Sequence, residues 1–366
     1  MNDRERILTL LRGNTPDRVP WFGDLDWWAY GMEKRGEAPP GFRSSEAYFQ
    51  LYRDLRVGFY LQGYEPFQAV YDESVQISEE TQGNRRRRTV HTPVGTISEE
   101  WTYLPTSFAE APTARFIKSP ADLPVFRYWV EHTEYRPLYD EAERRYGLVK
   151  DLGVVLCYLP KSPFMQLVVH MAGIRTVVDL WAEARGELEE TLEILERKTD
   201  EAAAIAVASP AECLMIPENL SAEVVGPRFY SLYMHPYEEK WTRRIAKAGK
   251  HSFIHMDGTL RGLIGHVARS GFQVIEAVTP APVGDLTFPQ MREMVGPETI
   301  LWGGVPGVYF TDGIDDVEFE RLIREVLQEM RRAPRYVLGV ADQVPPNALR
   351  RRIARVAELV ERYGTY

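Results

Sequence analysis

The residues with the clearest capacity for chemistry end the segment HSFIHMDG, where His255 and Asp257 follow a run of strand-forming residues and Gly258 comes next. Alternate residues of a strand point to the same side, so this spacing places the imidazole and the carboxylate together. Such a pair suits either a metal site or acid–base catalysis. A second strand-like run, YVLGVADQVPP, contains Asp342 near its end. These three residues are the first candidates for a functional centre.

The elements that must position them alternate between strand and helix from about residue 146. Helical spacing of apolar residues is clearest in EFERLIREVLQEMRR. With an N-terminal strand at 18–23 and an apolar segment at 57–71, about eight strands result, which predicts an α/β fold of the (β/α)8 TIM-barrel type. No G-x-G-x-x-G opens a helix after a strand, which argues against a dinucleotide fold. The six later strands are expected at Leu148–Tyr158, Glu212–Ile216, His251–Met256, Gln273–Ala277, Ile300–Gly303 and Tyr336–Val340.

Residues 75–104 depart from this rhythm, because polar and apolar residues alternate in VQISEE and GTISEEWTY. We expect a β-hairpin insertion within a single domain that spans residues 1–366. Its basic run, Arg85–Arg88, is either a solvated hairpin tip or a binding site for substrate carboxylates, since guanidinium groups pair well with carboxylates. On the second interpretation, Arg85 and Arg87 would contact the substrate.

Enzymes with this barrel place their active sites at the C-terminal ends of the strands. Each acidic residue there could instead be only the N-cap of the next helix, and the tryptophans could be packing residues. The candidates for catalysis are Asp26, Tyr158 and Glu218. The candidates for substrate binding are Trp27, Gln166 and Trp302, besides the two arginines.

Composition excludes several classes of protein. The net charge of −9 over 366 residues gives no support for nucleic-acid binding. No apolar run approaches the ~18 residues of a membrane span. The N-terminus has no apolar signal region, so a cytoplasmic location is expected. Cys157 and Cys213 lie in apolar runs and are expected to be buried free thiols. The expected partner is a small-molecule substrate, and a homodimer is compatible with the sequence.

The chain resembles the superfamily of uroporphyrinogen decarboxylases and of the corrinoid- or thiol-linked methyltransferases that share their barrel. The resemblance rests on TPDRVPW, HMDGTLRGLI with the following GFQVIE, LWGGVPG and GVADQVPPNA, which occur in the family's order. The methyltransferases hold zinc with a His-x-Cys on the fifth strand and a Cys near the last. His255 matches that histidine, and Asp257 and Asp342 stand at the cysteine positions. The resemblance therefore implies a divalent metal on these three residues, either zinc or a harder ion such as Mn²⁺ or Fe²⁺, with Glu218 as a further ligand or general base.

The decarboxylase branch carries an R-Q-A-G-R-Y motif after the first strand, where this chain has GDLDWWAYG and no arginine. The resemblance thus favours a metal-dependent methyltransferase or demethylase that acts on a small methylated substrate, with a corrinoid protein as partner. The first alternative is a decarboxylase in which Asp26 or Asp342 protonates a carbanion. The second alternative is a non-catalytic barrel that binds a corrinoid or another small molecule.

Overall fold

The computed structural model describes all residues from Met1 to Tyr366. The chain forms two compact units. We call the first the barrel unit, which contains Met1–Tyr64, Tyr139–Tyr158 and Pro210–Tyr366. The second, the insertion unit, contains Glu65–Leu138 and Leu159–Ser209. The sequence predicted a single domain with an insertion at 75–104 only, whereas the insertion unit also takes in helices that flank that segment.

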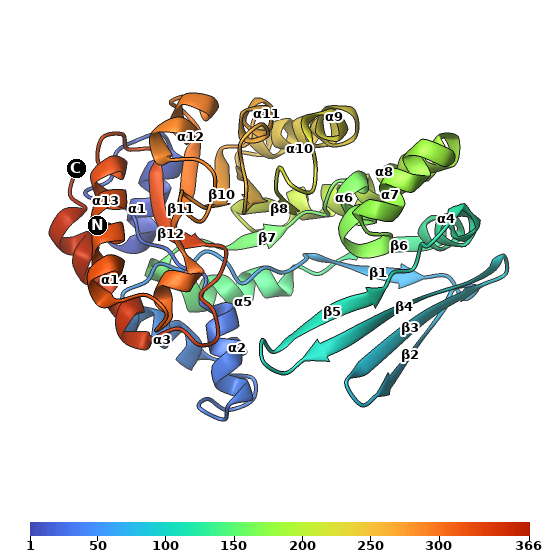
Figure 1. Ribbon diagram of the computed structural model, residues 1–366, viewed down its shortest axis with the longest axis horizontal. Coiled ribbons are helices and arrows are strands. Elements are labelled where there is room, and N and C mark those ends of the chain that lie inside the picture. Colours follow the sequence, from blue (N-terminus) through green and yellow to red (C-terminus); the bar gives the residue numbers. More distant parts are fainter. The chain divides into compact units, whose positions relative to one another are not determined.

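The six strands of the barrel unit are all parallel and form one sheet in the order β12-β11-β10-β9-β8-β7. Helices of the same unit lie outside this sheet (Figure 1). The elements of the barrel unit are α1 (Asp3–Leu11), α2 (Asp26–Lys34), η1 (Phe42–Ser44), α3 (Glu46–Leu55), α5 (Asp140–Val149), η3 (Lys150–Leu152), β7 (Leu156–Tyr158), β8 (Cys213–Leu220), α9 (Pro227–Phe229), η5 (Tyr230–Met234), α10 (His235–Lys247), β9 (His251–Met256), α11 (Ile264–Arg269), β10 (Val274–Val278), α12 (Phe288–Val295), β11 (Ile300–Pro306), η6 (Gly307–Phe310), α13 (Asp316–Met330), β12 (Tyr336–Ala341) and α14 (Arg350–Tyr363).

Parallel pairing continues past both edges of this sheet through single bridges. Trp21 pairs with Leu338 of β12, and Phe22 pairs with Gly58. The next residue, Phe59, pairs with Gly153, shortly before β7. The segments near residues 21 and 58 thus occupy the two remaining strand positions, and the predicted TIM-barrel-like α/β fold is confirmed. The strand expected at Leu148–Tyr158 is shorter, because residues up to Leu152 are helical.

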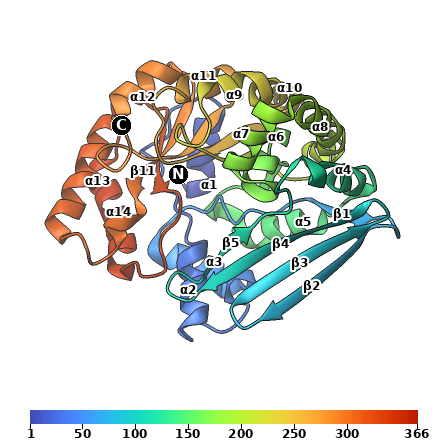
Figure 2. The same cartoon turned by 45° about the vertical axis from the view of Figure 1, so that its right-hand side comes forward.

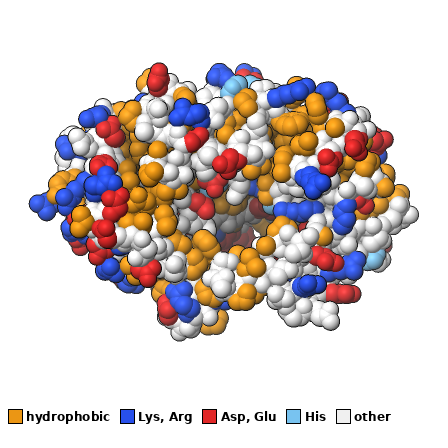
Figure 3. Space-filling view, in the orientation of Figure 1, with side chains coloured by type: hydrophobic (Ala, Val, Ile, Leu, Met, Phe, Trp, Pro, Cys, Tyr) orange, Lys and Arg blue, Asp and Glu red, His pale blue; other side chains and the backbone are white.

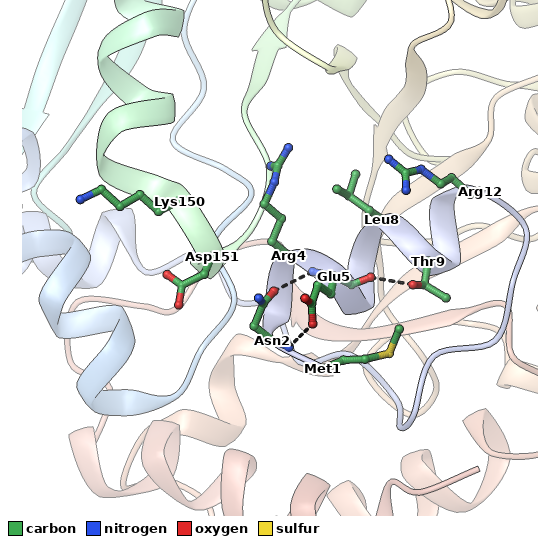
Figure 4. A pocket seen from close by; sticks show the side chains of 9 residues that line it. All are labelled: Met1, Asn2, Arg4, Glu5, Leu8, Thr9, Arg12, Lys150 and Asp151. Atoms are coloured by element: carbon green, nitrogen blue, oxygen red, sulfur yellow. Dashed lines mark hydrogen bonds between the residues drawn. The ribbon is translucent and has the colours of Figure 1, made fainter.

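The interior of the barrel is filled by alternate residues of the strands, as a closed sheet requires. Phe253, Val274 and Val337 belong to this core, together with apolar residues of α1. Helix α1 therefore covers the N-terminal end of the barrel, where the side chain of Gln273 donates a hydrogen bond to the carbonyl of Leu11. The helix begins with a capping box between Asn2 and Glu5 (Figure 4).

The insertion unit contains two antiparallel sheets. Strands β2 to β5 follow one another in the larger sheet, and β1 pairs with β6. Helix α4 packs against β3 and β4 (Figure 2). The elements of this unit are β1 (Phe67–Tyr71), β2 (Gln76–Gln82), β3 (Arg85–Thr92), β4 (Gly95–Leu104), β5 (Ala109–Ala114), η2 (Pro120–Asp122), α4 (Leu123–Glu131), β6 (Thr133–Pro137), α6 (Pro163–Met165), η4 (Gln166–Met171), α7 (Ile174–Glu183) and α8 (Arg185–Ala208).

The surface mixes charges of both signs. On the face drawn in Figure 3, basic and acidic side chains lie among hydrophobic and neutral ones. Many are paired along helices, as Arg321 is with Glu318 and Glu325 in α13. Charges of both signs are thus interspersed on that face. No helix combines the length and the hydrophobicity that a membrane crossing requires.

Trp302 corrects one expectation from the sequence, where it was a substrate-binding candidate. Its side chain has no exposed surface and lies in the barrel core. The centroid of its ring lies 4.3 Å from that of Tyr60 and 5.3 Å from that of Phe22. Gly339 leaves room for the indole, because a Cβ there would come within 2.7 Å of it. Its side chain points inward because Trp302 lies two positions after Ile300, another core residue of the same strand.

Replacement of this tryptophan by alanine tests its role. Trp302→Ala should lower the free energy of unfolding by about 3–5 kcal/mol, because a large cavity would remain in a closely packed core. Urea unfolding followed by circular dichroism measures the change. The control is Val317→Ala, at a side chain that is 80% exposed and should cost no more than about 0.5 kcal/mol. Equal effects of the two substitutions would contradict the core assignment.

Candidate functional site

Two neighbouring strands of the barrel unit bring an imidazole and a carboxylate side by side. The register of β9 and β10 pairs His255 with Glu276. Each lies two positions after a core residue, Phe253 or Val274, so both side chains point into the barrel above the apolar layer. His255 is 7% exposed and Glu276 is fully buried. The strand ends thus place a buried ionisable pair where barrel enzymes have their active sites.

Glu276 is held by hydrogen bonds at both of its oxygens. Nδ1 of His255 lies 2.6 Å from Oε2, and the hydroxyl of Tyr60 donates to Oε1 at 2.6 Å. Burial is the largest influence on the pKa of His255 and lowers it. The charge and hydrogen bond of Glu276, followed by the charges of Asp342 and Asp257, outweigh burial and raise the pKa of His255 to about 9. The imidazole is therefore protonated at neutral pH. Nδ1–H donates to Glu276, which leaves Nε2–H as the proton available to a ligand.

Asp342 lies beside that free nitrogen. It follows β12 directly, and its Oδ1 is 3.7 Å from Nε2 of His255, while half of its side chain is exposed. Desolvation raises the pKa of Asp342 to about 6; His255 opposes this rise, and Asp257 and Glu276 add to it. Its φ of 76° is in the left-handed region, which few residues other than Gly, Asn and Asp adopt. The loop must therefore hold Asp342 in place.

Asp24 provides that support. Its Oδ2 accepts a hydrogen bond of 2.8 Å from the side chain of Gln343, and its backbone carbonyl accepts one of 2.9 Å from the amide of Val344. Its Oδ1 accepts a third, from the amide of Asp26 at 2.8 Å. Burial, followed by the charge of Asp26, raises the pKa of Asp24 well above its usual range. Asp24 is thus a buried positioning residue that fixes the loop carrying Asp342.

Asp26, a predicted catalytic residue, is engaged with its own neighbours. Its Oδ2 lies 2.6 Å from the guanidinium of Arg43, and its Oδ1 accepts a hydrogen bond of 2.9 Å from Gln62. The guanidinium of Arg43 also lies 4.6 Å from the centre of the Tyr30 ring. The arrangement neutralises Asp26 by an ion pair. Trp27, which follows in the first turn of α2, is half-buried.

Tyr158 joins the site, at the end of β7. Burial raises the pKa of its hydroxyl above the usual range, and the charges of Asp24 and Glu276, followed by those of Asp26 and Asp342, add to the effect. Its phenol therefore stays protonated among the carboxylates of the barrel mouth. Gly63 makes room for it, because a Cβ there would fall within 1.9 Å of the ring.

Glu218 lies in a different cluster. Strand β8 runs on to Leu220 instead of ending at Ile216, so Glu218 is inside the strand and fully buried. Its charge raises the pKa values of Glu238 and Tyr230, in each case after burial as the larger cause. The structure therefore groups this predicted catalytic residue with Glu238 and Tyr230.

The three predicted metal ligands do not form a ready-made metal site. No group of three or more His, Cys, Asp or Glu side chains is arranged to hold a metal ion. His255 and Asp342 face each other, whereas Asp257 acts on both only through its charge. Metal-binding histidines usually donate a similar hydrogen bond from their second ring nitrogen. However, only two possible metal ligands, Nε2 of His255 and Asp342, face each other here, whereas a catalytic zinc site usually has three protein ligands. His255 is therefore better suited to act as an acid than as a metal ligand.

The remaining predicted residues belong to the insertion unit. The side chain of Gln166 donates hydrogen bonds to the carbonyl of Lys161 and to Thr199. Arg85 and Arg87 are exposed, whereas Arg86 and Arg88 line a cavity. The two predicted arginines thus lie on the exposed face of β3, because alternation along the strand separates the two pairs but does not say which face is covered.

A hollow of about 620 Å³ in the barrel unit is not a candidate for the site. It is lined by residues of α1 and by Lys150 and Asp151 (Figure 4). Helix α1 covers the N-terminal end of the barrel, whereas the acidic residues lie at the opposite ends of the strands. Of its polar groups, Asn2 and Glu5 cap the helix and Thr9 bonds back to the carbonyl of Glu5.

Sequence reasoning did not assign roles to two central residues, Glu276 and Tyr60. A usable signal existed for Glu276, because it is an acid in the middle of the otherwise apolar run VIEAV. A buried strand tolerates a carboxylate only when it has partners. Tyr60 lies in an aromatic segment where nothing distinguishes it from the packing residues around it.

Comparison with known proteins agrees with the fold. A family model described as "Uroporphyrinogen decarboxylase (URO-D)" matches residues 148–363. No curated protein sequence matches the chain. Among solved structures, a methyltransferase from Methanosarcina mazei superposes with a TM-score of 0.62 at 14% sequence identity, over 99% of each chain. At this identity, the likeness concerns the fold.

Removal of the charge on Glu276 should change the protonation of His255. Glu276→Gln keeps the size of the side chain, but the pKa of His255 should fall from about 9 to below 6.5, because burial is then no longer outweighed. NMR titration of the imidazole Cε1–H resonance measures it. The control, Tyr60→Phe, leaves the carboxylate in place and should keep the pKa above 6.5. An unchanged pKa in Glu276→Gln would contradict the assigned pairing.

Proposed function

The chain belongs to the uroporphyrinogen decarboxylase family, and we propose that it is an enzyme in which His255 acts as a general acid on a small-molecule substrate. One observation carries this proposal: Glu276 holds Nδ1 of a buried imidazolium, and its Nε2 faces Asp342. With one nitrogen engaged, only Nε2 can give a proton to a ligand. Tyr158 is a second proton donor at the same strand ends.

We propose demethylation or methyl transfer from a small methylated substrate as the reaction. The bond between the methyl carbon and a heteroatom breaks, and the heteroatom keeps the electron pair and takes the proton from Nε2 of His255. The methyl group passes to a nucleophilic acceptor, for which the resemblance described above suggests a corrinoid on a partner protein. The solved structure of similar fold is named a methyltransferase, which supports this choice by analogy only.

Decarboxylation is the second candidate, because the same imidazolium could protonate the carbanion that remains after loss of CO₂. The matching family model is named for a decarboxylase. Against it, the first strand is followed by Asp24 and Asp26 rather than by free arginines, and Arg43 is already paired with Asp26. A substrate carboxylate would therefore find little positive charge there apart from His255.

Substitution of the imidazole tests the general-acid role. His255→Gln should lower kcat by about 10²–10⁴-fold, the usual contribution of a positioned acid. The assay offers methyl ethers, methylamines and methyl thioethers with a reduced corrinoid as acceptor, and a parallel panel of carboxylic acids, and measures demethylated product or CO₂. Activity of the wild type on either panel assigns the reaction. Full activity of His255→Gln would overturn the proposal.

The pH dependence of the same activity follows from the charge on His255. Its acid form is lost as the pH rises through about 9, so kcat should fall along an alkaline limb near that value. Asp342→Asn removes a charge that supports the imidazolium, and the limb should move to lower pH. Asp257→Asn is the control and should move it less, because Asp257 has the smaller influence. An alkaline limb that both variants leave unchanged would contradict His255 as the acid.

A divalent metal remains a rival proposal, with Nε2 of His255 and Asp342 as its ligands. Calorimetric titration of the protein with Zn²⁺, Mn²⁺ and Fe²⁺ tests it, with elemental analysis of the purified protein. We expect no stoichiometric binding, because the donors facing each other are too few. Stoichiometric binding by the wild type that His255→Gln abolishes would favour the metal-dependent form of the enzyme over the general-acid form.

A further inference from the structure

The insertion unit contains a cavity of about 470 Å³ that none of the functions above uses. Its walls come from strands β3 and β4, from α4 and from the π-helical turn η4, all within this unit. The volume falls in the range of ligand pockets, which is roughly 300–1,000 Å³. A hollow of this size in a packed unit could accommodate a small organic molecule.

Two arginines of β3, Arg86 and Arg88, line this cavity together with tryptophans. The register of β3 and β4 sets Arg88 opposite Glu99 and Arg86 opposite Trp101. The guanidinium of Arg88 lies 6.0 Å from the ring centre of Trp129, and that of Arg86 lies 5.7 Å from that of Trp101. Outside the lining, a third guanidinium, from Arg115, lies 5.2 Å from the ring centre of Trp101. Aromatic faces stabilise these charges without neutralising them.

Two of these three cations lack a carboxylate partner. Arg86 pairs with Glu110 at 2.5 Å and with Glu79 at 3.3 Å. Arg88 forms no ion pair or hydrogen bond through its side chain, and the guanidinium of Arg115 bonds only to the carbonyl of His170, at 3.3 Å. Both side chains are half-buried. Glu99 lies opposite Arg88 and its charge acts on Arg115, but it forms no ion pair with either, so both guanidinium groups keep donors for a ligand.

Positive charge also reaches the cavity from groups outside its lining. Burial and then the charges of Lys161 and Arg115 lower the pKa of His170, which lines the cavity, to about 4. Burial lowers the pKa of Arg115, and the charge of Glu99 only partly opposes this change. The lining itself contains two arginines, Arg86 and Arg88, and two glutamates, Glu65 and Glu99.

We propose that this cavity is a second ligand site, which binds a small aromatic carboxylate. Its carboxylate would lie on the guanidinium groups of Arg88 and Arg115, and its ring against the indoles of Trp101 and Trp129. The indole of Trp129 is already part of an aromatic wall, with Phe116 at 5.3 Å and Tyr71 at 6.2 Å between ring centres. The site does not depend on the reaction at His255.

Titration with benzoate tests the proposal, with tryptophan fluorescence and calorimetry as readouts. Saturable binding is expected, with weaker binding of benzyl alcohol, which lacks the charge, and of acetate, which lacks the ring. Arg88→Ala and Arg115→Ala should each weaken binding by about 10-fold or more, as the loss of a charge-assisted hydrogen bond predicts. Arg88→Lys should give an intermediate loss of benzoate affinity, because lysine keeps the charge but lacks the paired N–H donors of the guanidinium group.

The matched control is Arg87→Ala, on the opposite face of the same strand, where the side chain is exposed and bonds only to Ser98. It should bind benzoate as the wild type does. His255→Gln should also bind normally, which separates this cavity from the site in the barrel. Urea unfolding of each variant verifies that it is folded. No saturable binding, equal losses in Arg87→Ala and Arg88→Ala, or loss in His255→Gln alone would overturn the proposal.

Discussion

The hydrogen bond between Nδ1 of His255 and Glu276 is the interaction on which the barrel site depends. A carboxylate in an apolar interior is costly unless its oxygens have partners, and His255 and Tyr60 supply one each. The register of β9 and β10 makes this possible, since a slip of one residue would turn one side chain away. Directly after Glu276 the register of β10 shifts, and Gly303 of β11 permits it, because a Cβ there would come within 2.4 Å of the Val278 carbonyl.

The barrel mouth stabilises its acids in different ways. Glu276 is paired with the imidazolium of His255, and Asp26 with the guanidinium of Arg43. Burial raises the pKa of Asp24 well above its usual range, and its two oxygens accept hydrogen bonds from Gln343 and from the amide of Asp26. A cluster of carboxylates in one place requires either cations or shared protons, and a metal ion is only one source of positive charge. Because the chain supplies its own, the excess of acids alone does not require a metal.

Periodicity predicted the parts of this molecule that depend on local pattern. The bounds of β9 agree with the predicted segment, and the barrel follows from the alternation of strands and helices. Contacts between strands could not be read in this way. The pairing of His255 with Glu276 depends on register, and the choice between Arg87 and Arg88 depends on which face of β3 the helix α4 covers. The segment before β7 was misassigned because its apolar residues belong to the end of a helix and to a short strand.

The insertion unit contrasts with the barrel mouth. In the barrel mouth, Glu276 and Asp26 are paired with cations, whereas in the insertion unit Arg88 and Arg115 are half-buried and form no ion pair. A fold selected for stability alone has no reason to keep such groups, because the loss of solvation is not repaid. Contact with water would remove this cost of desolvation, but the aromatic side chains around Trp129 limit the access of water. The arrangement is therefore better explained by an anion that binds and leaves than by packing, since the indoles hold the guanidinium groups ready without occupying their hydrogen-bond donors.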